Sequence, residues 1–228
     1  MASGNLSPRQ KMINLMYLIF IAMLAMNMSK EVLQAFGLMD TKLVSANEAA
    51  TARNDRSYED LAMKAVEQAE KYGDEKVKAD KIQALSTEFY QYIENMKDEM
   101  KATVDDPTDY QTMDSGKFLD EKFFKGDDGQ YKEEGQAFLD NMNNYRAEIV
   151  NVLGDGNENI KNDVVNRFST DKVTNREGKE IFWLDYNYKG FPLVASITKL
   201  TQIQADIKTT ESRSLEECSR GRWRVTSL

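Results

Sequence analysis

The chain shows two kinds of apolar pattern. Residues 12–28 (MINLMYLIFIAMLAMNM) form an almost uninterrupted apolar run, whereas later apolar residues recur every three or four positions between charged ones. At 1.5 Å per helical residue, the first pattern and its helix-permissive continuation can cross a hydrocarbon core about 30 Å thick. It predicts one transmembrane helix over residues 12–34. The second pattern predicts a soluble helical domain over residues 35–212.

Four long helices are expected in this arrangement. One continues the membrane span through Val32, Phe36 and Leu43, and the others cover 58–100 with an interruption near Gly73, 138–153 as far as Gly154, and 193–207 after Pro192. Four amphipathic helices pack most simply as an antiparallel bundle. The predicted fold class is therefore all-α, with a single membrane helix that continues into a four-helix bundle.

Two connections, residues 104–132 and 169–191, are longer than a bundle needs and are rich in turn residues and aromatics. The second is expected to contain a hairpin, because Ile181, Trp183 and residues 186–188 have strand-like composition. Long loops commonly bind partners. The aromatic side chains could equally cover the open end of the core.

The start of the membrane helix carries its own signals. Ser7 as N-cap and Pro8 at the first helical position are typical of a capped helix. Because Arg9 and Lys11 precede the span, residues 1–11 are expected in the cytoplasm and the domain in the bacterial periplasm, anchored in the inner membrane. A cleaved signal peptide is the alternative. It is disfavoured because the apolar run exceeds a signal core and no small-x-small cleavage site follows.

Polar residues on the span indicate helical partners. An asparagine amide that faces lipid is costly, so Asn14 and Asn27 favour burial against other helices, although both could lie at membrane interfaces. Arg9 lies in the first turn, where the helix dipole disfavours a cation. It is either a topology signal or a cation that awaits a membrane carboxylate on another chain. Six residues are predicted to pack against a partner: Asn14, Met16, Tyr17, Phe20, Met23 and Asn27.

Composition excludes several kinds of chemistry. The 228 residues contain no histidine and one cysteine, so the chain has no Ser-His-Asp triad, His-ligated zinc site or internal disulfide. A net charge of -8 argues against nucleic acid as a partner. The acidic stretch from Asp155 fails the calcium-loop pattern at Ile160 and Asn166, and Ser196-x-x-Lys199 has no K-T-G after it. We therefore expect no enzyme activity, no cofactor and no metal site.

The end of the chain changes character. After an acidic helical stretch, the sequence SLEECSRGRWRVTSL becomes basic and aromatic. Residues 213–228 are therefore expected to be an appended tail outside the folded domain.

One block of sequence is specific enough to suggest a family. The segment SPRQKMINLMYLIFIAMLAMNMSKEVLQAFGLMD, including the cap from Ser7 to Lys11 and the following SKEV and AFGL, resembles the GldM family, also called PorM. That family belongs to the Bacteroidetes gliding and type IX secretion machinery. Residues 35–210 are similar to its helical domain, with less distinctive motifs. Because full-length members continue into β-rich periplasmic domains, the resemblance implies an N-terminal fragment.

The resemblance also implies a motor. It implies a homodimer whose two membrane helices sit inside a ring of a GldL-like polytopic membrane protein. The proton-motive force would drive this motor, and the periplasmic part would pass work to other components of the secretion system. Arg9 matches the family's arginine at the start of the span and would face a membrane carboxylate of the ring. The alternative is a membrane-anchored periplasmic sensor or scaffold.

Overall fold

The computed structural model describes residues 7–221, except the side chains of residues 22–29. The described residues are mainly helical, as predicted, with one two-stranded sheet. In chain order the elements are α1 (Pro8–Glu67), α2 (Ala69–Lys101), η1 (Tyr110–Thr112), α3 (Lys117–Phe123), α4 (Glu133–Leu153), α5 (Glu158–Arg167), β1 (Val173–Thr174), β2 (Glu180–Ile181), α6 (Trp183–Tyr188) and α7 (Leu193–Arg220).

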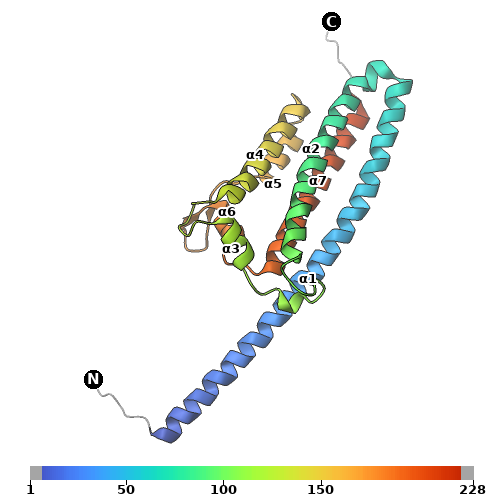
Figure 1. The fold of residues 1–228 in the computed structure, drawn as a ribbon. Helices are drawn as coiled ribbons and strands as arrows, with labels where there is room; N and C mark the ends of the chain where they lie inside the picture. Colours follow the sequence, from blue (N-terminus) through green and yellow to red (C-terminus); the bar gives the residue numbers. More distant parts are fainter. Residues whose placement is uncertain (1–6, 222–228) are drawn as a thin grey trace.

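Helix α1 is 60 residues long and unbroken. It begins as the sequence predicts, because the Ser7 side chain accepts a hydrogen bond from the Gln10 N–H at 3.3 Å and Pro8 occupies the first turn. Its first part, residues 8–32, extends beyond the other helices and is called the projecting helix below (Figure 1). The predicted membrane span and the first stripe of the soluble domain therefore belong to one element.

The break between the first two helices falls at Gln68 rather than near Gly73. Gln68 has φ -135° and ψ 61°, and the chain reverses there to form an antiparallel hairpin of α1 and α2 (Figure 1). Gly73 continues α2, although glycine costs a helix about 1 kcal/mol relative to alanine. Burial of Tyr72 and Ala79 on either side of it outweighs that cost.

Helix α7 runs parallel to α1, which corrects the prediction of a simple antiparallel bundle. The Thr198 hydroxyl donates to the Phe36 carbonyl, and farther along both helices the Asn54 amide donates to the Lys208 carbonyl. The long connection from α4 through α5, the hairpin and α6 allows this orientation. It returns the chain to the end from which α1 projects before α7 begins (Figure 1).

Aromatic side chains fill the core between α2, α4, α5 and the loops. The ring of Tyr145 lies tilted against that of Phe89 at 5.1 Å and meets Phe168 edge-on at 4.9 Å, measured between ring centroids. The Tyr145 hydroxyl reaches Ser86 at 3.0 Å, so its polar end is satisfied inside the core. Trp183 packs on the edge of this core, as expected if loop aromatics cover its open end.

The loop over residues 169–191 contains the predicted hairpin, but only part of its predicted strand residues. β1 and β2 pair antiparallel, with Val173 opposite Ile181. Trp183 and residues 186–188, however, belong to helix α6. The i, i+4 spacing of Leu184 and Tyr188 explains this difference, because a single helical turn buries both of them in the core.

The folded domain does not end at residue 212. Helix α7 continues to Arg220, and Leu215 is only 2% exposed. Leu215 and Cys218 pack with Leu61 and Tyr72 in a small apolar cluster below the turn that joins α1 to α2. The expectation that residues 213–220 lie outside the fold is therefore wrong, while residues 222–228 lie outside the described part.

Candidate functional site

The projecting helix exposes the residues that the sequence predicts to bind a partner. Asn14, Met16, Tyr17 and Phe20 are all exposed, and Met16 keeps 68% of its surface. Because the large apolar side chains of Met16, Tyr17 and Phe20 are not buried within the described chain, the projecting helix has apolar surface that no other described residue covers. The predicted contacts of Met23 and Asn27 involve side chains outside the described residues.

Arg9 lies exposed in the first turn of α1. Among the described residues, none forms an ion pair with it. Within the same part of the chain, no helix has both the length and the apolar character required to span a bilayer.

The projecting helix enters the domain at Leu33, which is 3% exposed and belongs to the main core. The predicted end of the membrane span, residue 34, therefore lies inside the folded domain. From Leu33 onward, buried positions of α1 repeat every seven residues, the spacing of a helix that packs lengthwise on another. The members of this repeat are Leu33, Asp40, Asn47, Asn54 and Leu61, and Gly37 is buried between the first two.

The three polar members of this repeat contact α7 directly. The Thr201 hydroxyl donates to the Asp40 carboxylate at 2.5 Å, and the Asn47 amide donates to the Thr201 carbonyl at 3.2 Å. The Asn54 amide donates to the Lys208 carbonyl at 3.0 Å. We call this row the polar seam: Asp40, Asn47 and Asn54 with their partners on α7.

A buried carboxylate continues the polar seam towards the turn. Glu211 is 2% exposed and forms an ion pair with Lys208 at 2.9 Å. The Asn54 amide and the Tyr58 hydroxyl donate to it at 3.4 Å. Burial raises the pKa of Glu211 above its usual value, although its ion pair with Lys208 acts in the opposite direction.

The polar seam fixes how α1 and α7 are aligned along their length. A slide of one residue moves α1 by about 1.5 Å and rotates its contact face, which would separate buried polar groups from their partners. An unpaired buried polar group costs about 1–3 kcal/mol. Buried polar residues at core positions of packed helices specify register for this reason.

A second buried network joins α7 to α2. Lys97 is 1% exposed, and its ammonium donates to Glu94 at 2.9 Å and to the Gln204 side chain at 2.8 Å. Burial alone would raise the pKa of Glu94, but hydrogen bonds from Gln204 and Lys97 hold that pKa below its usual value. Helix α7 is thus fixed to both of its long neighbours by buried polar contacts.

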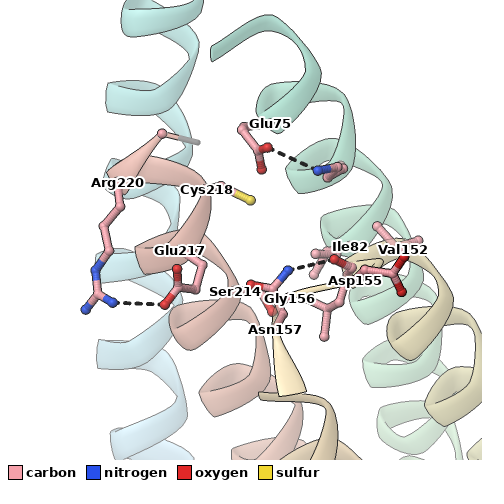
Figure 2. Close-up of a pocket in the computed structure, with 13 residues that line it drawn as sticks. Glu75, Ile82, Val152, Asp155, Gly156, Asn157, Ser214, Glu217, Cys218 and Arg220 are labelled. Carbon is pink, nitrogen blue, oxygen red and sulfur yellow. Dashed lines mark hydrogen bonds and ion pairs between the residues drawn. The ribbon is translucent and has the colours of Figure 1, made fainter. Parts of the chain in front are cut away.

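A pocket of about 240 Å³ lies between the first part of α2, the end of α4 and the end of α7 (Figure 2). Its walls carry two ion pairs, Glu75 with Lys78 at 3.0 Å and Glu217 with Arg220 at 2.9 Å. Burial raises the pKa of the Cys218 thiol in this wall to about 12, so the reactive thiolate is disfavoured. Within the described residues, no group of acidic or cysteine side chains is arranged to hold a metal ion.

The Ser196-x-x-Lys199 pair lies on the buried side of α7. Ser196 is buried and its hydroxyl has no hydrogen-bond partner among the described residues, so a substrate could not reach it without opening the core. Burial lowers the pKa of Lys199 to about 8. Its ammonium donates to the Asn187 carbonyl and lies 3.7 Å from the centre of the Phe191 ring, which gives it a packing role.

Comparison with known families agrees with a folded domain that extends from about Leu33 to Arg220. A family model described as the GldM N-terminal domain matches residues 31–221. The chain belongs to the GldM family. The match begins two residues before Leu33 enters the core and ends one residue after Arg220, so it covers the folded domain. A search of curated proteins finds no match.

Membership in the GldM family supports a component of gliding motility and type IX secretion. The resemblance of the N-terminal block led to the same family. The polar seam was not anticipated from the sequence. The sequence does contain a seven-residue repeat from Leu33 to Leu61 that could have indicated it. Because three of the five positions are polar, however, the repeat does not look like the apolar side of a buried helix.

Proposed function

We propose that this GldM domain is the inner-membrane and periplasmic-base part of a motor that uses the proton-motive force to power type IX secretion and gliding. In this proposal the projecting helix crosses the membrane and moves against a ring of a GldL-like membrane protein. The domain carries the motion into the periplasm. The protein is not an enzyme in this proposal, because its work is mechanical.

The continuity of α1 is the observation that carries the proposal. At about 1.5 Å per residue, its 60 residues span about 90 Å without a break. A movement at Arg9 would reach the domain through one hydrogen-bonded helix rather than through a flexible linker. The polar seam then ties that helix to α7, and the Lys97 network ties α7 to α2. Rotation or displacement of α1 would therefore move the whole domain.

The exposed apolar surface of the projecting helix supports burial in a membrane assembly. Two such helices, from a homodimer, would place the predicted partner residues against each other and against the ring. An amide on this surface would find hydrogen-bond partners there that lipid cannot supply. The runner-up function, a membrane-anchored periplasmic sensor or scaffold, would use the same helix only as an anchor.

Arg9 is the proposed coupling residue. A membrane carboxylate of the ring attracts its guanidinium while ionised and loses that attraction when protonated. Since two helices cannot match every subunit of a ring of different symmetry, protonation of one subunit would change which contact is preferred. Proton flow would thereby turn one part against the other.

Substitution of Arg9 tests the proposal in cells that carry the complete secretion system. Arg9→Ala should abolish gliding and secretion, Arg9→Lys should keep a part of both, and Lys11→Ala is the matched control that should leave both intact. The purified complex should contain a small polytopic membrane protein that is lost when residues 1–30 are deleted. Normal secretion by Arg9→Ala would exclude the coupling role. Retention of the partner without residues 1–30 would favour the scaffold.

A further inference from the structure

A short segment crosses α1 where the projecting helix enters the domain (Figure 1). It covers residues 104–116, includes η1, and is called the strap below. The ring of Tyr110 in the strap packs against α1 at Gly37. A Cβ atom added to Gly37 would lie 2.0 Å from Cγ of the Tyr110 ring. Only glycine therefore leaves room for this ring.

Hydrogen bonds hold the ring in place along one turn of α1. The Tyr110 hydroxyl and the Thr41 hydroxyl lie 2.9 Å apart, and Thr41 also donates to the Gly37 carbonyl at 3.0 Å. The ring thus contacts the helix backbone at one residue and is hydrogen-bonded to the helix four residues later. This contact restrains both tilt and rotation of α1 at that turn.

The other end of the strap is fixed to the start of α7. Met113 is buried, and its carbonyl accepts a hydrogen bond from the Val194 N–H at 3.3 Å. The Ser115 carbonyl accepts from the Leu193 N–H at 3.0 Å. These carbonyls satisfy N–H groups of the first helical turn, which have no partner inside a helix. The strap therefore joins α7 and α1 at the point where α1 leaves the domain.

We infer that Tyr110 and Gly37 are positioning residues that fix the direction of the projecting helix relative to the domain. The inference rests on the proposed function for its purpose, because a motor needs a defined axis between its membrane and periplasmic parts. From Gly37 to Arg9 the helix spans about 42 Å at 1.5 Å per residue. A tilt of about 10° at Gly37 would move Arg9 by about 7 Å, enough to misplace it against a partner helix, since packed helix axes lie about 8–10 Å apart.

The chain offers matched variants for a test. Gly37→Ala should expel the Tyr110 ring, and Tyr110→Ala should remove it. Gly73→Ala is the control, because it makes the same change inside α2 where an added Cβ meets nothing within 4 Å. Alanine favours helix more than glycine does, so lower helix propensity cannot explain a loss of order in Gly37→Ala. Tyr110→Phe keeps the ring contact and removes only the hydroxyl.

Spin labels on Lys11→Cys and Lys125→Cys, in a Cys218→Ser background that leaves no third thiol, report the direction of the helix in the full chain in detergent, diluted with unlabelled chain. We expect one narrow distance distribution for the parent and Gly73→Ala, and a small broadening for Tyr110→Phe. Gly37→Ala and Tyr110→Ala should broaden the distribution or shift it by about 5 Å or more, which is the size of displacement that a tilt of about 10° at Gly37 would cause. If Gly37→Ala fails to fold, Tyr110→Ala decides the outcome.

Two readouts separate this inference from the proposed function. An unchanged distance distribution in both Gly37→Ala and Tyr110→Ala overturns the inference, whatever happens to secretion. A broadened or shifted distribution supports the inference. If secretion then remains normal, positioning by the strap stands and the proposed transmission through α1 fails.

Discussion

A kink placed in the projecting helix is the sharpest test of transmission through α1. Glu31 is exposed and lies two residues before Leu33 enters the core. Glu31→Pro removes one backbone hydrogen bond, and the proline ring clashes with the carbonyl four residues earlier, at a cost of about 3 kcal/mol or more if the helix stays straight. The helix should instead bend by more than about 20° at this point.

The size of the displacement follows from the length of the projecting helix. From Glu31 to Arg9 the helix spans about 33 Å at 1.5 Å per residue. A bend of about 25° would displace Arg9 by about 14 Å, more than the distance of about 8–10 Å between packed helix axes. The domain should keep its fold, because the core of α1 begins after the substitution.

The assay compares secretion and gliding with the thermal stability of the purified chain. Glu31→Pro should abolish secretion while the melting temperature of the domain changes little, and Glu31→Ala should match the parent in both. The bend itself can be checked with the spin labels described for the strap. Secretion at the parent level by a chain with a demonstrated bend would refute transmission through a rigid α1.

Three further predictions concern the domain. Asn54→Ala should lower the free energy of unfolding by about 1–3 kcal/mol in chemical denaturation, because it removes two hydrogen bonds to acceptors on α7, whereas Asn95→Ala on the exposed side of α2 should cost much less. Leu215→Ala should cost about 2–5 kcal/mol, and a cost no larger than that of the exposed Glu216→Ala would place residues after 212 outside the cooperative fold. Because the folded pKa of Glu211 is raised, the folded state binds its proton more tightly, and this group lowers stability as pH rises from about 4.3 through the folded pKa. Glu211→Gln should remove that part of the pH dependence. If the unfolding free energy of the variant changed between pH about 4.3 and the folded pKa by as much as that of the parent, Glu211 would not be the group responsible.

Local signals in the sequence predicted the parts of the fold that depend on neighbouring residues. The cap at Ser7 and Pro8, the helical character of the long stripes and the hairpin after α5 are all present in the structure. Predictions failed where two distant segments decide the outcome. The turn falls at Gln68 rather than near Gly73, because packing of Tyr72 and its neighbours overrides the low helix propensity of glycine.

The candidate site likewise contains features that the sequence predicts and features that only tertiary contacts create. The sequence predicts that Arg9 and the apolar surface of the projecting helix contact a partner, because an apolar run and its flanking charges are visible without knowing any contact. It did not identify the polar seam. Asp40, Asn47 and Asn54 are ordinary polar residues until α7, more than 150 residues later, supplies their partners.

By itself, the sequence determined that this protein is helical, that its first helix begins after the capping residue Ser7 and carries an unusually apolar segment, and that it resembles the GldM family. Those features depend on residue spacing and local hydrogen bonding. Only the tertiary structure decided that α1 and α7 run parallel and that the Tyr110 ring rests on Gly37. Each of these results from contacts between segments far apart in the chain, where the gain from burial and paired polar groups exceeds local preference.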